Sequence, residues 1–321
     1  MLTNVTNHAG KSPPVAIGRS APWCEVISLA KKMAPLQMPV LITGQSGVGK
    51  EVVAQILHYW SERDRADLIP LNCGLLQDQL LESELFGHKK GAFTGATQTH
   101  DGLFQAASDG TLFLDEIGEL SATCQAKLLR VLEAGEYRPL GSTQIKRTNA
   151  RIIAATHRDL EKMISQGRFR QDLYYRLNVL TINIPPLCQR TEDIPLLVDH
   201  FLGQSQAGTS PPVLVPGAMK QLMAHHWPGN VRELKNVIER LRVYCDGEIG
   251  PESVESILSS QSNSGGGEHQ LATFHSTATL AKMEHTYVQW VIDQCGGNIS
   301  QASRILGVSR TTIYKIQSTP Q

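Results

Sequence analysis

Two groups of residues in the sequence have the types and the spacing that phosphate chemistry needs. The first is a glycine-rich run after the apolar residues 40–43, and it consists of Gly44, Gln45, Ser46, Gly47, Val48, Gly49, Lys50 and Glu51. Glycines let backbone N–H groups wrap a phosphate, Lys50 reaches the terminal phosphates, and a helix over residues 51–60 adds its positive dipole end. The run therefore predicts a phosphate-binding loop. A glycine-rich turn without a ligand is the alternative, and Glu51 stands where serine or threonine normally contacts Mg²⁺.

The second group is a pair of acids, Asp115 and Glu116, which follows the apolar residues 111–114. Asp115 would hold Mg²⁺ through water, and Glu116 would orient and deprotonate an attacking water. Two acids at the end of a strand could also be a solvated edge or the first turn of a helix. Because they follow a phosphate-binding loop in the same chain, the catalytic interpretation is favoured.

A third buried strand, over residues 151–155, ends in Thr156 and His157. At the tip of a strand these two side chains could lie near the terminal phosphate and sense its presence. A histidine in such a place is more often a structural group, so the sequence leaves the role of His157 open.

Arg170 and Arg176 are six residues apart. The permanently charged fork of arginine suits a transferring phosphoryl group, and in ring-forming ATPases it often comes from the neighbouring subunit. The alternative is that both arginines form surface ion pairs with acids such as Asp172.

A parallel sheet must position the phosphate-binding loop, the acid pair and the Thr156–His157 tip, because each of these three follows a short, continuously apolar run. The predicted fold class is therefore α/β, with a further helix over residues 23–33. Pro185 and Pro186 end the α/β region, and helical periodicity dominates residues 191–258.

The helical region contains one further candidate for phosphate binding. Asn230 is a plausible N-cap before an amphipathic run, and Arg232 would project from the first turn, where a helical lid could lower it onto nucleotide. His225 and His226 are interpreted as structural.

A stretch of small residues around one aromatic lies between the two phosphate-binding groups. It consists of Gly91, Ala92, Phe93, Thr94, Gly95 and Ala96. A lone phenylalanine among small and charged neighbours has little apolar company, so the stretch predicts a loop that presents Phe93 and Thr94 to a partner. An ordinary turn whose aromatic packs back onto the core is the alternative.

The end of the chain predicts a separate unit. Residues 259–270 have the composition of a linker, and helices are predicted over residues 280–295, 299–306 and 310–316. A glycine-bearing turn before a polar, basic helix is the helix-turn-helix pattern. The residues available to contact DNA are Ser309, Arg310, Thr311, Thr312, Tyr314 and Lys315. A small dimerising three-helix unit is the alternative.

Composition sets broader limits. The 321 residues are 41% hydrophobic, and 30 basic residues balance 30 acidic ones, so nucleic-acid contacts must be local. The six cysteines are scattered, which argues against a zinc site or a disulfide framework. Without an apolar run long enough for a membrane span or a signal peptide, we expect a cytoplasmic protein.

Taken together, the motifs resemble the bacterial enhancer-binding proteins, the NtrC-type AAA+ activators of sigma-54 RNA polymerase. The resemblance runs from about Ile17 to Cys245 and continues in a Fis-like helix-turn-helix. It implies a P-loop ATPase with an α-helical lid, MgATP bound by Lys50 and Asp115, and water activated by Glu116. Glutamate after the lysine, at Glu51, is the family's own form.

The resemblance also implies roles for residues that the motifs leave open. Asn72 is similar to a switch asparagine that holds the catalytic glutamate. Arg170 and Arg176 are similar to arginine fingers that act across a subunit boundary in a hexamer, and Arg232 to the second sensor of the lid. Residues 91–96 are similar to the loop that engages sigma-54, so the implied function is remodelling of the closed promoter complex.

The sequence departs from the family pattern in places. Gln105 stands where many relatives have glutamate, and His157 replaces a frequent asparagine. The segment before the first motif is too short for a sensor domain, which resembles the phage-shock activator subgroup controlled in trans by a partner protein. The chain ends at Gln321 without a basic finish, so DNA anchoring is expected to need several copies.

The expected domains are a tail over residues 1–14, an α/β subdomain over 15–185, a lid over 186–258, a linker over 259–276 and a helix-turn-helix over 277–321. Two rival functions remain at this point. One is a general AAA+ remodeller whose loop grips another client, and the other is a DNA-binding regulator with an inactive ATP site.

Overall fold

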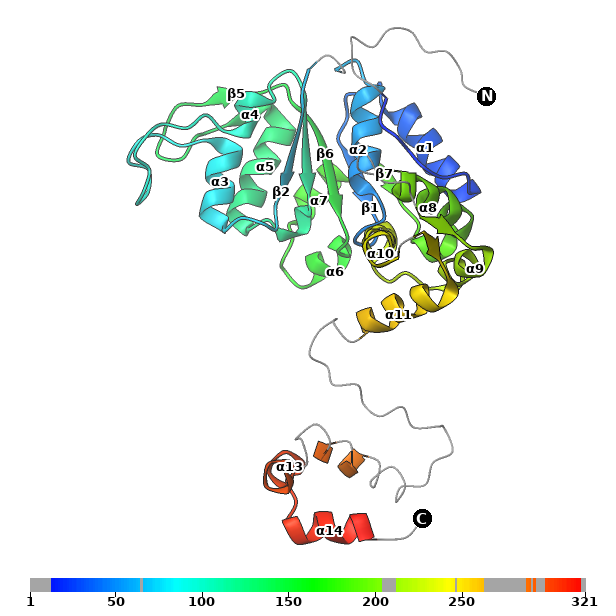
Figure 1. Ribbon diagram of the computed structural model, residues 1–321. Coiled ribbons are helices and arrows are strands. Elements are labelled where there is room, and N and C mark those ends of the chain that lie inside the picture. Colours follow the sequence, from blue (N-terminus) through cyan, green and yellow to red (C-terminus); the bar gives the residue numbers. More distant parts are fainter. Residues whose placement is uncertain are drawn as a thin grey trace. The chain divides into compact units, whose positions relative to one another are not determined.

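The structure of the protein is a computed structural model that describes residues 13–63, 66–203, 212–245, 247–262, 287–289, 291–292 and 298–318 (Figure 1). Contacts divide the chain into two compact units, Met1–Ser259 and Ser260–Gln321. Most of the predicted tail over residues 1–14 lies outside the described residues. So does most of the predicted linker, although helix α11 (Pro251–Ser262) extends into its first residues.

A five-stranded parallel sheet forms the centre of the larger unit. In sheet order, its strands are β2 (Leu68–Asn72), β3 (Thr111–Asp115), β6 (Arg151–Thr156), β1 (Val40–Thr43) and β7 (Leu180–Asn183). All residues of β6 and most of those in β1 and β3 are buried, as expected where helices cover both faces of a parallel sheet. The predicted α/β class and its buried strands are confirmed.

Side chains of successive strand residues point to opposite faces of the sheet, and this alternation creates two cores. Val40, Ile42 and Phe113 pack with α1 (Ala21–Met33) and α2 (Lys50–Tyr59) on one face. Leu41 and Leu112 pack on the other face. The helices there are α3 (Asp78–Phe86), α4 (Leu103–Ala106), α5 (Ala122–Ala134), α6 (Leu160–Ser165) and α7 (Gln171–Leu177). Figure 1 shows α1 and α2 on one side of the sheet and α3 and α5 on the other.

The register of the sheet brings the polar strand ends together. Thr43 is paired with Thr156, and Asn72 with Asp115, so the last residues of four strands lie along one edge. A short antiparallel hairpin, β4 (Glu136–Tyr137) and β5 (Lys146–Arg147), and the 3-10 turn η1 (Ile117–Glu119) complete the α/β part.

The helical lid has a core of its own, which includes Trp227, Leu234 and Ile238. Its elements are η2 (Leu187–Gln189), η3 (Thr191–Asp193), α8 (Ile194–Gly203), α9 (Pro216–Ala224), α10 (Asn230–Tyr244) and α11, with the short strands β8 (Val213–Leu214) and β9 (Glu248–Ile249). None of the described helices of the chain is long and apolar enough to cross a membrane.

The smaller unit contains α13 (Ile299–Leu306) and α14 (Arg310–Ser318). Asn298 caps α13 by accepting hydrogen bonds from two backbone N–H groups, and Gly307 ends it with a left-handed φ of 65°. The predicted turn over residues 307–309 is therefore confirmed. Of the helix predicted over residues 280–295, the described parts at 287–289 and 291–292 are helical, and the rest lies outside the described residues.

Candidate functional site

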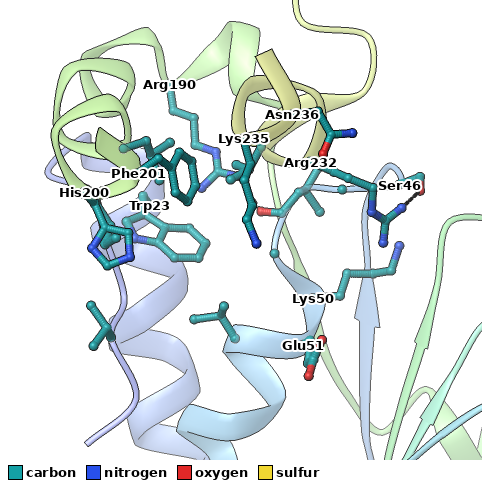
Figure 2. Close-up of a pocket in the computed structure, with 18 of the residues that line it drawn as sticks. Trp23, Ser46, Lys50, Glu51, Arg190, His200, Phe201, Arg232, Lys235 and Asn236 are labelled. Atoms are coloured by element: carbon teal, nitrogen blue, oxygen red, sulfur yellow. Dashed lines mark hydrogen bonds between the residues drawn. The ribbon is translucent and has the colours of Figure 1, made fainter. Parts of the chain in front are cut away.

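The phosphate-binding loop joins β1 to α2 and lines a cavity of about 490 Å³ (Figure 2). Gly47 and Gly49 have φ angles of 77° and 107°, a left-handed region that a side chain disfavours. Lys50 is buried at the start of α2, and its Nζ donates to the carbonyls of Gly44 and Gln45 at 3.1 and 3.2 Å. The loop thus holds its lysine in place at the amino-terminal end of a helix, where an anion is favoured.

Helix α10 of the lid contacts this loop directly. Arg232 donates from Nη1 to Ser46 Oγ at 2.8 Å, so the arginine expected to act from the lid reaches the cavity. The backbone N–H of Val231 donates to the carbonyl of Gly47 at 3.0 Å. Figure 2 shows Arg232 and Lys235 projecting from α10 toward the cavity above Lys50.

The prediction that Asn230 caps α10 is wrong. Gly229 is the N-cap, and its N–H donates to Glu233 Oε2 at 2.7 Å. Asn230 lies inside the helix start with a φ of 54°, and its side chain points to the phosphate-binding loop instead of to the helix's own N–H groups. The partners that it finds in tertiary structure could not be seen in the local sequence.

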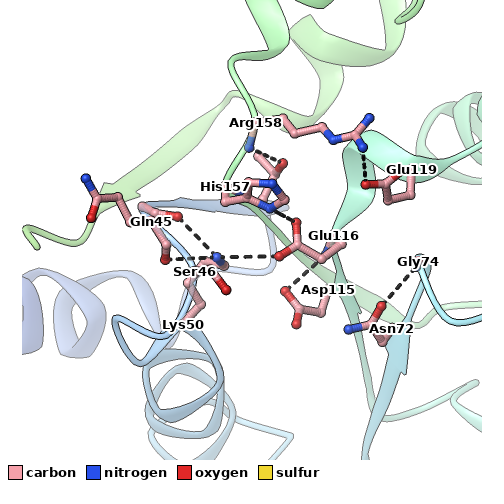
Figure 3. Close-up of polar contacts among 12 residues, drawn as sticks. Gln45, Ser46, Lys50, Asn72, Gly74, Asp115, Glu116, Glu119, His157 and Arg158 are labelled. Carbon is pink, nitrogen blue, oxygen red and sulfur yellow. Dashed lines mark hydrogen bonds and ion pairs between the residues drawn. The ribbon is translucent and has the colours of Figure 1, made fainter. Parts of the chain in front are cut away.

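The two predicted acids lie beside Lys50 (Figure 3). Burial raises the pKa of the Asp115 carboxyl above its ordinary value, and the nearby charge of Glu116 raises that pKa further. Glu116 Oε1 lies 3.7 Å from Lys50 Nζ, and its Oε2 lies 2.6 Å from His157 Nδ1. Glu116 also has a left-handed φ of 55°, a backbone conformation that residues other than glycine adopt rarely.

The structure brings the predicted sensor residues to the same edge. Thr156 is buried at the end of β6, and its Oγ1 accepts the N–H of Arg158 at 3.0 Å. His157 contacts Glu116 through its ring, as Figure 3 shows. The side chain of His157 is therefore in contact with the acid assigned to water activation.

Asn72 lies next to Asp115 in the sheet but does not contact Glu116 among the described residues. Its Oδ1 accepts the N–H of Gly74 at 2.9 Å and so closes the turn after β2 (Figure 3). The Asn72–Glu116 contact that the resemblance implies is therefore not formed in this conformation. Here the carboxylate of Glu116 contacts His157 and Lys50 instead.

The two candidate arginine fingers are exposed and lie outside the cavity lining. Arg170 pairs with Asp172 through two hydrogen bonds of 3.0 and 2.7 Å, and these bonds lower the pKa of the Asp172 carboxyl. This is the surface ion pair that the sequence offered as an alternative. Within the described part of the chain, Arg176 has no ion-pair partner.

The loop of residues 91–96 is carried by a paired stalk in which His88 and His100 exchange backbone hydrogen bonds of 2.9 Å. Phe93 is half-buried, and its ring meets the His88 ring edge-on at 5.0 Å, whereas Thr94 is exposed. Gly91 and Gly95 have left-handed φ angles of 82° and 103°. The tip therefore rests on its own stalk and is not inserted into either core.

Sequence reasoning missed one part of the cavity lining, which contains Trp23 and Arg190. The Arg190 guanidinium lies 4.6 Å from the centre of the Trp23 ring, and burial lowers the pKa of Arg190 to about 10. His200 and Phe201 of α8 complete this part of the lining (Figure 2). Trp23 could be read only as an apolar helix residue, because nothing in its local sequence points to a ligand.

In the smaller unit, the side chains expected to face DNA are exposed while Ile313 of the same helix is buried. Those exposed residues are Ser309, Arg310, Thr311, Thr312, Tyr314 and Lys315. Ser309 Oγ accepts the N–H of Thr312 at 3.1 Å and caps α14. One face of α14 is thus packed on α13, and the side chains expected to contact DNA lie on the exposed face.

Comparison with known families agrees with this geometry. Residues 16–183 match the family described as the Sigma-54 interaction domain. The chain belongs to the sigma-54-dependent transcription activators. Residues 188–271 match the AAA+ ATPase lid domain, and residues 279–317 match the bacterial regulatory proteins of the Fis family. The predicted resemblance, the ATP-binding AAA+ fold and the DNA-binding helix-turn-helix are therefore confirmed.

Individual relatives support the assignment. The chain is 46% identical over 305 residues to the transcriptional regulatory protein GlrR of Escherichia coli K12, covering 94% of this chain and 67% of GlrR. It is 43% identical over 307 residues to the Nif-specific regulatory protein of Azotobacter vinelandii, covering 95% of this chain and 58% of the relative.

Solved structures show the same architecture. NtrX from Brucella abortus in complex with ATP superposes with a TM-score of 0.69 at 32% identity, covering 94% of this chain and 68% of NtrX. A Thermotoga maritima RuvB mutant superposes with a TM-score of 0.52 at 15% identity, covering 92% of this chain and 85% of RuvB, which shows a shared fold only.

Proposed function

We propose that the protein is an ATPase that assembles as a hexameric ring on upstream DNA and remodels the closed complex of sigma-54 RNA polymerase into an open complex. The observation that carries the proposal is that one α/β unit contains both a phosphate site with a paired acid and a loop of the sigma-54-contacting type, which lies between α3 and α4. The residues for ATP hydrolysis and the loop for partner contact thus belong to the same α/β part of the chain. We place this activity in the bacterial cytoplasm.

Hydrolysis is assigned to residues around Lys50. Lys50 and the loop N–H groups would bind the phosphates, and Glu116 would orient the attacking water and accept its proton. The contact of His157 with Glu116 supports a role for His157 in sensing the terminal phosphate together with Thr156. Arg232 would contact the phosphates from the lid.

The residues also fit a magnesium ion. Asp115 offers a half-buried carboxylate in the cavity lining, and oxygen ligands of this kind suit Mg²⁺, which keeps most of its waters. When bound, the ion would neutralise phosphate charge. Glu51, also in the cavity lining, is the second carboxylate available there.

Arg170 and Arg176 support assembly into a ring. Both are exposed and lie outside the cavity of their own chain, so a neighbouring subunit would be the recipient of their charge. Arg170 would have to exchange its partner Asp172 for a phosphate. Asn72 would take up its contact with Glu116 in another nucleotide state.

Phe93 and Thr94 are assigned to contact with sigma-54, flanked by Gly91, Ala92, Gly95 and Ala96. The residues assigned to DNA, at the start of α14, are Ser309, Arg310, Thr311, Thr312, Tyr314 and Lys315. The domain limits that go with these roles are those expected from the sequence, namely residues 15–185, 186–258 and 277–321.

The test uses purified sigma-54 and a nucleotide complex that mimics the transition state of ATP hydrolysis. ADP with a metal fluoride that mimics the transferring phosphate should trap a complex of the protein with sigma-54, and Phe93→Ala should abolish the trap while ATP turnover continues. Lys50→Ala should abolish both turnover and open-complex formation. If the wild-type protein hydrolyses ATP but is never trapped on sigma-54, the protein is a remodeller of another client. Full transcription by Lys50→Ala would instead identify a DNA-binding regulator with an inactive ATP site.

A further inference from the structure

The lid supplies a hydrogen-bond donor to each of three consecutive carbonyl groups of the phosphate-binding loop. The pairs, donor first, are Asn230 Nδ2 with Ser46 O at 3.0 Å, Val231 N with Gly47 O at 3.0 Å, and Arg190 Nη2 with Val48 O at 2.5 Å. In a trans peptide the C=O group of one residue and the N–H group of the next point in opposite directions. Holding these carbonyls therefore turns the following N–H groups away from the lid donors, toward the side where a phosphate binds.

Among these donors, Asn230 joins three segments of the chain through its side chain and backbone. Its side chain is fully buried, with Oδ1 accepting the N–H of Leu187 at 2.8 Å while Nδ2 donates to Ser46 O and to Gln45 Oε1, both at 3.0 Å. Because the Leu187 N–H can only donate and the Ser46 carbonyl can only accept, the orientation of the amide is fixed. One side chain thus joins the phosphate-binding loop, the start of the lid and helix α10.

The backbones of the phosphate-binding loop and of the lid are also in direct contact, at Gly47 and Gly229. A methyl group on Gly47 would lie 2.4 Å from the carbonyl oxygen of Gly229, so only glycine fits there. Asn230 itself has a φ of 54°, a conformation that asparagine, aspartate and glycine tolerate better than other residues. The position therefore needs both a tolerant backbone and an amide side chain.

We propose that Asn230 is a positioning residue of the phosphate site, which holds the Ser46–Gly47 peptide so that the Gly47 N–H faces the phosphate. The proposal rests on the proposed ATPase function, since it names how the lid controls that same site. When the lid moves away it takes its donors with it, and the loop loses the shape that binds phosphate. Lid position and phosphate affinity are then linked through Asn230 and not only through the charge of Arg232.

Two variants separate the amide from the backbone. Asn230→Asp keeps an acceptor for Leu187 and the tolerated φ but removes the donor to Ser46 and Gln45, whereas Asn230→Gly keeps the φ and removes every side-chain bond. Because each lost hydrogen bond changes an equilibrium by about 2- to 10-fold, we expect the Kd for MgATP to rise about 10-fold or more in both variants. KM should rise in parallel while kcat at saturating ATP stays within about twofold, since binding is lost and chemistry is not.

Asn149→Asp is the matched control, because it makes the same chemical change at an exposed asparagine at the other end of β6. Its Kd, KM and kcat should equal those of the wild type. Hydrogen exchange of the peptide spanning residues 44–50, measured without nucleotide, should be faster in both Asn230 variants than in the wild type, with exchange in α5 unchanged.

Wild-type affinity in Asn230→Asp and Asn230→Gly, or unchanged exchange over residues 44–50, would overturn the proposal. If the wild-type protein itself binds no MgATP, the proposed function fails. In that case, hydrogen exchange over residues 44–50 in the wild type and the Asn230 variants is the measurement that decides whether Asn230 shapes the loop.

Discussion

The resting position of the loop of residues 91–96 depends on a close contact between Ala92 and Gly141, which one added methyl group on Gly141 should break. A methyl group on Gly141 would lie 2.8 Å from Cβ of Ala92 and 3.1 Å from its Cα. The neighbouring Leu140 exchanges backbone hydrogen bonds of 2.9 and 3.0 Å with Gly87 and Lys89 at the root of the loop. Ala92, beside the loop tip, therefore packs on the segment after β4.

The magnitude of the effect follows from two contributions. Extra bulk in a packed contact costs about 1–3 kcal/mol, and this cost falls only on the state in which the loop rests on Gly141. Gly141 also has a φ of 71°, at which alanine costs about 1–2 kcal/mol. This cost is the same whether the loop rests on Gly141 or is lifted away from it, as contact with a partner would require. Gly141→Ala should therefore shift the equilibrium toward the lifted loop by about 5- to 150-fold.

Hydrogen exchange of the peptide spanning residues 88–100, measured without nucleotide, checks this shift. Exchange should be faster in Gly141→Ala than in the wild type. Adding Ala92→Gly to the same variant removes the methyl–methyl contact but leaves the φ strain, so exchange should return toward the wild-type rate. Equal exchange in Gly141→Ala and the wild type would refute the idea that the loop rests on this contact. A double variant as fast as the single variant would show that the contact with the Ala92 methyl group is not the cause.

Three further outcomes are expected. Glu116→Gln should still bind ATP but lose at least about 100-fold in phosphate release, because an amide cannot accept the proton of the attacking water; undiminished release would exclude Glu116 as the base. Asp193→Ala should lower the free energy of unfolding in urea by about 3 kcal/mol. The reason is that buried Asp193 accepts hydrogen bonds from Arg19 N–H, Ser20 N–H and Ser20 Oγ at 2.7–2.8 Å. A change below about 1 kcal/mol would contradict this. Burial raises the pKa of the Cys73 thiol to about 12, so at pH 8 it stays protonated and should resist iodoacetamide while exposed Cys24 is alkylated; mass spectrometry of the labelled peptides decides.

Features that depend on neighbouring residues in the chain could be predicted from the sequence. The strand of residues 40–43, the glycine-rich loop and the acid pair were predicted because an apolar run, glycines and charges act over a few residues. The turn over residues 307–309 was predicted for the same reason, since Gly307 and Ser309 end and begin helices by local hydrogen bonds.

Features that depend on distant segments could not be predicted. Asn230 was expected to cap its own helix, yet its partners Gln45 and Leu187 lie far away in the chain. Trp23 and Arg190 likewise meet only because α1 and the start of the lid pack against the same cavity. A local pattern predicts which bonds a side chain could make, but the tertiary structure decides which partner it finds.

Backbone strain points to the same region of the molecule. Among the described residues, those other than glycine with a left-handed φ are Glu116, Trp227 and Asn230. Such conformations cost about 1–3 kcal/mol each and persist only where surrounding contacts impose them. For Glu116 those contacts are Lys50 and His157, and for Asn230 they are the phosphate-binding loop and Leu187. Two of the three strained residues therefore lie at the phosphate site: a bound phosphate would compete with Glu116 for Lys50, and the contacts of Asn230 hold the loop that binds the phosphate. Nucleotide binding would thus act on strained segments of the sheet edge and of the lid at once, which gives a physical route from phosphate chemistry to lid movement.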